Sequence, residues 1–118
     1  MALLEAATGL ALMAAPSLVV SLLLGATLDT PGGLRVAQVA GAALLSLGLA
    51  CWLARDDGGS MAGRAIVAAM LLYNFVIVAL LAYSGLALSM AGIGLWPAVG
   101  AHAALGSWCA ARVRSGSS

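Results

Sequence analysis

Two polar side chains that could carry chemistry lie inside long apolar stretches. One is Asn74, within LLYNFVIVALLAY (71–83), and the other is His102, the only histidine of the chain. An imidazole can bind a ligand or relay a proton, and an ionisable residue inside a membrane is a functional hypothesis by default. A carboxamide in such surroundings needs a partner, because an unpaired amide in an apolar medium costs about 4–8 kcal/mol.

Four polar or irregular positions are expected at the same depth in the membrane: Pro16, Ser46, Asn74 and His102. Each lies nine to eleven residues from a charged residue that marks the cytoplasmic end of its helix. At a rise of about 1.5 Å per residue this depth is about 15 Å, near the middle of a bilayer. We therefore expect Asn74 to bond to His102, to Ser46 or to the backbone carbonyl that Pro16 frees.

Two interpretations of this layer remain open. In the first, Pro16, Ser46, Asn74 and His102 form a small site in which His102 binds a ligand or relays a proton. In the second, the polar groups only join helices, at about 0.6 kcal/mol for each hydrogen bond. No second ionisable group is expected in the layer to pass a proton onward, so the packing interpretation is favoured.

The composition indicates that the solvent of this protein is mostly lipid. Of the 118 residues, 64% are hydrophobic and 8% are charged, whereas soluble domains average about 25% charged residues. The net charge is +1 and the chain has no basic stripe, which argues against binding to nucleic acid.

The apolar lengths between charges predict four membrane-spanning helices, each near the ~20 residues that a span needs. We expect an all-α, integral membrane four-helix bundle with short loops, formed by a single domain of residues 1–118. The expected helices are residues 3–24, 31–54, 61–86 and 95–113, followed by a polar tail at 114–118. Thr30 and Ser60 are placed to cap the second and third helices, and Pro31 suits a first helical turn.

The arginines predict the orientation. Four of the five fall on the side that holds the second loop and both termini, so both termini are expected in the cytoplasm. The stretches LEAATGLALMAAPSLVVSLLLG, LLYNFVIVALLAY and LWPAVGAHAALGSWC resemble those of small four-helix bacterial inner-membrane proteins, in the neighbourhood of the DoxX-like membrane subunits. The resemblance implies a multi-pass bundle of the bacterial inner (plasma) membrane and implies no catalytic residue.

The remaining candidate groups are expected to be structural. Glu5 is predicted at the cytoplasmic edge, paired with Arg64 or Arg112, whereas the carboxylate of small multidrug transporters sits in mid-membrane. Cys109 and His102 are seven residues apart, about 10 Å along a helix, which is too far to share a metal ion. We expect no metal site and no cofactor; a single histidine also argues against a haem held by two axial histidines.

These observations predict a protein without enzymatic activity, because no nucleophile–base arrangement and no phosphate loop is present in the sequence. The favoured function is an accessory or scaffold subunit or a small oligomer, whose partners are the lipid bilayer and a second copy or another membrane subunit. Small-residue faces around Gly41, Gly48 and Gly106 support it, since such faces let helices approach closely in lipid. The alternative is a small transporter or ligand-binding membrane protein that uses the midplane site around His102 and Asn74.

Overall fold

The protein is helical throughout the part that the structure describes. The computed structural model describes residues 1–116, which form five α-helices and no strand. The helices are α1 (Ala2–Ala14), α2 (Pro16–Leu24), α3 (Pro31–Leu53), α4 (Met61–Leu86) and α5 (Leu95–Ser115). The all-α prediction is confirmed.

The prediction of one continuous first helix over 3–24 is wrong. The chain breaks at Ala15, whose φ is −142° and ψ is 63°, and the two short helices meet at 117°. Pro16 explains the break, because its ring disfavours helical geometry at the preceding residue and it has no N–H to donate. The same proline then starts α2 at a position where a helix needs no donor.

The starts of the two long helices follow the local sequence. The hydroxyl of Thr30 accepts a hydrogen bond from the Gly33 amide at 3.0 Å, and that of Ser60 accepts one from the Gly63 amide at 3.0 Å. Both predicted caps are confirmed. At the C-terminus, α5 continues through Ser115, two residues past the expected end; residues 117–118 of the predicted tail lie outside the described residues.

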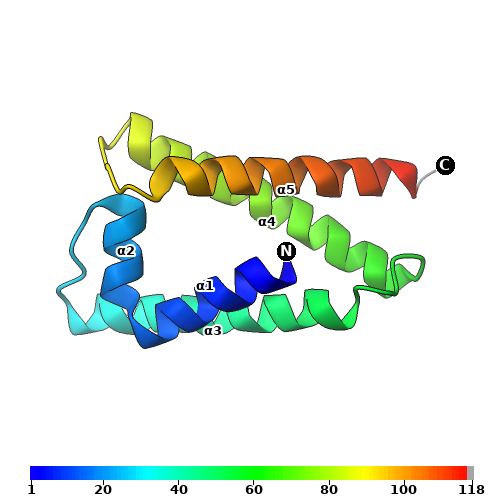
Figure 1. Ribbon diagram of the computed structural model, residues 1–118, viewed down its shortest axis with the longest axis horizontal. Coiled ribbons are helices and arrows are strands. Elements are labelled where there is room, and N and C mark those ends of the chain that lie inside the picture. The colour runs from blue at the N-terminus through cyan, green and yellow to red at the C-terminus, as the bar shows by residue number, and fades with distance from the viewer. Residues whose placement is uncertain (117–118) are drawn as a thin grey trace.

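The helices form two antiparallel pairs, α1 with α3 and α4 with α5 (Figure 1). Glycines allow the first pair to pack backbone against backbone: a Cβ at Gly9 would lie 2.6 Å from the Gly41 carbonyl oxygen, and one at Gly48 would lie 2.8 Å from the Ala6 amide nitrogen. The small face of α3 is therefore filled by α1 of the same chain.

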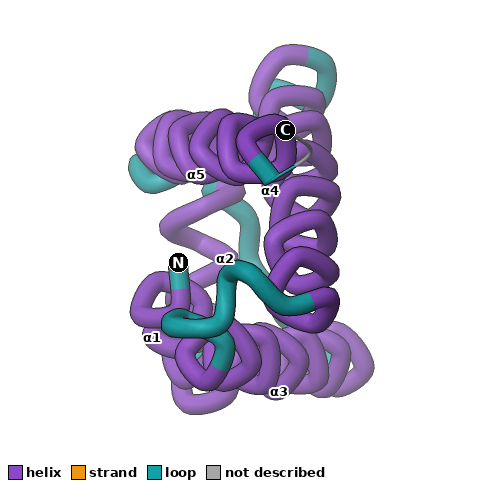
Figure 2. Tube along the Cα trace, turned by 90° about the vertical axis from the view of Figure 1, so that its right-hand side faces the viewer, coloured by secondary structure: helices purple, strands orange, loops and turns teal. Residues whose placement is uncertain are grey.

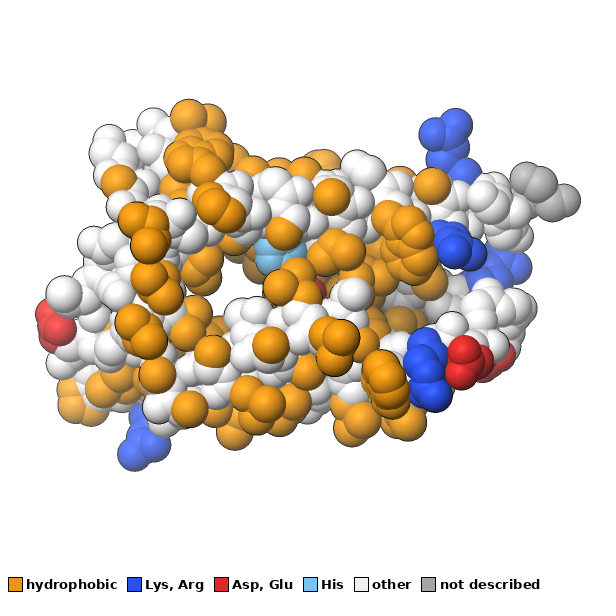
Figure 3. Space-filling model, in the orientation of Figure 1, with side chains coloured by type: hydrophobic (Ala, Val, Ile, Leu, Met, Phe, Trp, Pro, Cys, Tyr) orange, Lys and Arg blue, Asp and Glu red, His pale blue; other side chains and the backbone are white. Residues whose placement is uncertain are grey.

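The short helix α2 crosses from the first pair to the second (Figures 1 and 2). The Gly94 amide, just before α5, donates a hydrogen bond of 2.7 Å to the Leu22 carbonyl oxygen of α2. A hollow opens between the two pairs in the space-filling view (Figure 3). The link through α2 closes one end of the molecule while the pairs stay apart near its middle.

Two of the described helices, α3 and α4, are long and apolar enough to cross a membrane, and α1 with α2 makes a third if the bent pair counts as one span. Large apolar side chains lie on the outside of the long helices, among them Val36 and Phe75, both 71% exposed. The fully buried apolar side chains in residues 1–116 are few: Met70, Leu95 and Cys109. This distribution is compatible with a protein surrounded by lipid.

Candidate functional site

Asn74 and His102 meet across the α4–α5 pair. The Asn74 Oδ1 and the His102 Nδ1 are 2.8 Å apart, and the Asn74 Nδ2 donates to the Met70 carbonyl oxygen at 2.8 Å. Asn74 is completely buried. Of the three partners expected for this carboxamide, the structure shows His102.

The Asn74 contacts define which nitrogen of His102 carries its proton. The Met70 carbonyl can only accept a hydrogen bond, so the Asn74 amide nitrogen faces it and the amide oxygen faces the imidazole. That oxygen is an acceptor, and the His102 Nδ1 must therefore be the donor. The Nε2 is then left with its lone pair, and no hydrogen-bond partner for it lies among residues 1–116.

Tyr73 connects this pair to the N-terminal helix. Its ring packs edge-on against the His102 imidazole, with 5.8 Å between the ring centroids and 76° between the planes. Its side chain also lies close enough to the Glu5 carboxyl group of α1 to interact with it. We call the set Glu5, Tyr73, Asn74 and His102 the interior polar cluster.

Glu5 lies in the interior, and its predicted ion pair with Arg64 or Arg112 is wrong. Its side chain is 1% exposed, and its Oε1 has no hydrogen-bond partner. Neither Arg64 nor Arg112 forms an ion pair with it, and Arg55 pairs with Asp56 instead. The bend at Ala15 accounts for the difference, because it leaves α1 only 13 residues long and packed against α3, with Glu5 turned towards α4.

The other two predicted site residues lie outside the cluster. Ser46 is exposed, and its hydroxyl donates to the Ala42 carbonyl oxygen of its own helix at 2.9 Å. Pro16 lines a separate pocket of about 630 Å³ at the helix break. The carbonyl that Pro16 frees is that of Leu12, and Asn74 donates to Met70 instead of to it. At the neighbouring Met13, the carbonyl oxygen accepts a 3.2 Å hydrogen bond from Gln38 Nε2.

The cysteines contribute no ligand set. Cys51 and Cys109 are both free thiols, and the buried Cys109 Sγ lies 3.5 Å from the Met1 Sδ. Within residues 1–116, no three His, Cys, Asp or Glu side chains come together in an arrangement that could hold a metal ion.

The chemistry available in the interior polar cluster is the exchange of a proton or a cation. It contains one carboxylate that forms no ion pair with an arginine, one phenol and one imidazole whose Nε2 has no partner in residues 1–116; the amino group of Met1 is the positive charge that acts on this carboxylate. A charged carboxylate in apolar surroundings is stabilised by a proton or by a positively charged occupant. Glu5 thus supplies the second ionisable group that the sequence did not reveal in this layer.

Comparisons with protein-family models, with curated proteins and with solved structures found no match.

Proposed function

We propose that this chain is a small multi-pass membrane transporter, without enzymatic activity, that binds a proton or a small monovalent cation at the interior polar cluster. The observation that carries the proposal is Glu5, a carboxylate that is 1% exposed and has an oxygen without a partner. Groups of this kind inside membranes are costly, and they mark ion and substrate paths. Packing alone does not require a charge at this position, since an apolar side chain would cost less.

The proposal includes the membrane arrangement. The long helices α3 and α4 are two spans, α5 is a third, and α1 with α2 is a broken first span, which together make a four-segment bundle in a bacterial inner membrane. Broken segments are tolerated at membrane depth where the protein buries them, and they line the ion sites of several transporter classes. The excess of arginines near the α3–α4 loop and the end of α5 supports placing both termini in the cytoplasm.

Proteoliposomes test this function directly. Purified protein is reconstituted with an internal pH-sensitive dye, a pH gradient is imposed, and proton flux is recorded alongside the uptake of radiolabelled methylammonium. We expect wild-type protein to carry one of the two, and Glu5→Gln and His102→Ala to lose the flux. Ser46→Ala is the matched control, because its hydroxyl bonds only within α3. Wild-type vesicles no leakier than empty ones to either solute would overturn the proposal.

A second candidate function is an accessory subunit or a small oligomer. It is favoured by an exposed small-residue face on α5, formed by Gly100, Ala104, Ser107 and Ala111. A Cβ at Gly100 would meet nothing within 4 Å, so this face is not used inside the protomer. Crosslinking of an Ala104→Cys variant in native membranes tests it. The expected result is a crosslinked product, either a dimer at twice the monomer mass or an adduct with another subunit. Monomer alone at every crosslinker length would remove its support.

A further inference from the structure

A pocket of about 800 Å³ lies where α3 ends, α4 begins and α5 ends, and none of the four residues of the interior polar cluster lines it. Arginines are gathered at this end of the molecule (Figure 3), and three of them line the pocket: Arg55, Arg64 and Arg112. No acidic side chain lines it among the residues that the structure describes. The rim of the pocket is therefore cationic.

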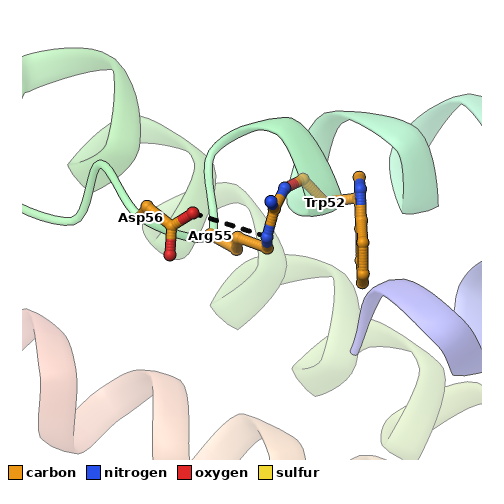
Figure 4. Close-up of polar contacts among 3 residues, drawn as sticks. All are labelled: Trp52, Arg55 and Asp56. Atoms are coloured by element: carbon orange, nitrogen blue, oxygen red, sulfur yellow. Dashed lines mark hydrogen bonds and ion pairs between the residues drawn. The ribbon is translucent and has the colours of Figure 1, made fainter.

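The charge of the rim is only weakly compensated. The Arg55 Nε lies 3.4 Å from the Asp56 Oδ2, but Asp56 is 86% exposed in its side chain, and ion pairs this open contribute little. Figure 4 shows the Arg55 side chain between Asp56 and Trp52, and its NH1 also donates to the Trp52 carbonyl oxygen at 2.8 Å. The Arg112 guanidinium lies over the Trp108 ring, 5.0 Å from its centroid, which orients it without neutralising it.

The rest of the lining is mostly apolar. It includes Met1, Ile66, Val67 and Trp108, all of which are partly exposed. Arginines beside tryptophans are typical of the level at which lipid headgroups meet the hydrocarbon. The pocket thus presents positive charge at its rim and hydrocarbon along its wall, an arrangement complementary to an anionic amphiphile.

We propose that this pocket binds an anionic phospholipid, with its phosphate at Arg55, Arg64 and Arg112 and the first part of an acyl chain along Ile66 and Val67. A soluble anion would leave the apolar wall unused, and a zwitterionic lipid brings its own cation to a rim of three arginines. The inference does not depend on the transport proposal, because the pocket shares no residue with the interior polar cluster.

Thermal unfolding of the purified protein in detergent tests the site, with four additives in parallel: phosphatidylglycerol, phosphatidylcholine, glycerol phosphate and inorganic phosphate. We expect phosphatidylglycerol alone to raise Tm, in a saturable manner. The double variant Arg64→Gln/Arg112→Gln should bind it about 30-fold more weakly, since each arginine near an anionic lipid contributes about 1 kcal/mol. Arg35→Gln, at the opposite end of α3 and bonded to Gln38, is the control and should bind like wild type.

Three results would overturn the proposal. They are an equal Tm shift with phosphatidylcholine, an equal shift with either water-soluble phosphate, and unchanged phosphatidylglycerol affinity in the double variant. Native mass spectrometry on the same samples counts bound lipid without reference to unfolding. It therefore separates loss of the site from loss of the fold in the double variant.

Discussion

The His102 imidazole is held by the Asn74 carboxamide across α4 and α5, with 2.8 Å between Nδ1 and Oδ1. Because the other end of the carboxamide is bonded to the Met70 carbonyl oxygen, Asn74 cannot turn to present its nitrogen to the ring without losing that bond. In the neutral imidazole, the contact thus places the proton on Nδ1 and leaves the lone pair on Nε2.

Replacing Asn74 with leucine should destabilise the protein. Leucine is similar in size but cannot accept from His102, so a half-buried donor is left without its partner, at a cost of about 1–3 kcal/mol. Thermal unfolding in detergent should show a lower Tm than wild type. Ser84→Ala on the same helix is the control, since its hydroxyl bonds only to the Leu80 carbonyl oxygen of its own helix. An unchanged Tm in Asn74→Leu would mean that the hydrogen bond contributes nothing net.

An alanine at Gly9 should push α1 away from α3. The new Cβ would lie 2.6 Å from both the Gly41 carbonyl oxygen and the Leu45 amide nitrogen, and these are backbone atoms that cannot rotate aside. Overpacking of this kind costs about 1–3 kcal/mol. Gly100→Ala is the matched helical control because its Cβ meets nothing within 4 Å, and it should gain up to about 1 kcal/mol. Equal Tm values for the two variants would contradict the close packing of α1 on α3.

Glu5→Gln should stabilise the protein while it abolishes function. Glutamine keeps the shape of the side chain and removes a buried charge that no arginine pairs with and whose Oε1 has no hydrogen-bond partner, and neutral replacements of buried charges are often stabilising. We expect a higher Tm at neutral pH. Asp56→Asn, a change at an exposed carboxylate, should stay within about 0.5 kcal/mol of wild type. A clear loss of stability in Glu5→Gln would show that the carboxylate serves the fold.

Single cysteines test the membrane orientation. In a background without Cys51 and Cys109, we expect Gly32→Cys to react with an impermeant maleimide in intact cells. Gly58→Cys should react only after the membrane is opened. Both sites tolerate the change, because a Cβ at either meets nothing within 4 Å. The reverse pattern would invert the orientation, and labelling of both in intact cells would indicate mixed insertion.

Sequence predicts best what depends on near neighbours in the chain. The caps at Thr30 and Ser60 and the start of α4 at Met61 follow from a few adjacent residues, and the structure has them as predicted. His102 is one of the three partners that the sequence offers for Asn74, because the depth of each residue can be counted in helical rise from an arginine on the same side.

Depth alone does not give the direction in which a side chain points. Ser46 lies at the expected level of its helix but is exposed, so the layer of polar residues is not a ring of contacts. The predicted position of Glu5 at the cytoplasmic edge is wrong for a different reason. It assumes a straight first helix, whereas the chain bends by 117° at Ala15. Pro16 signals that a break can occur there, but its angle is set by tertiary contacts such as that of Gln38 with Met13.

The interior polar cluster is made of residues from both helix pairs. Glu5 belongs to the α1–α3 pair, whereas Tyr73, Asn74 and His102 all belong to the α4–α5 pair. An occupant that contacted both Glu5 and the α4–α5 side of the cluster would bind both pairs at once. Binding of the occupant and approach of the two helix pairs would then be linked. The free energy by which the occupant prefers the closed arrangement would stabilise that arrangement by the same amount. Without an occupant, the two pairs are joined by the α3–α4 loop, by the crossing helix α2 and by the contacts of Glu5 with Tyr73 and of Met1 with Cys109.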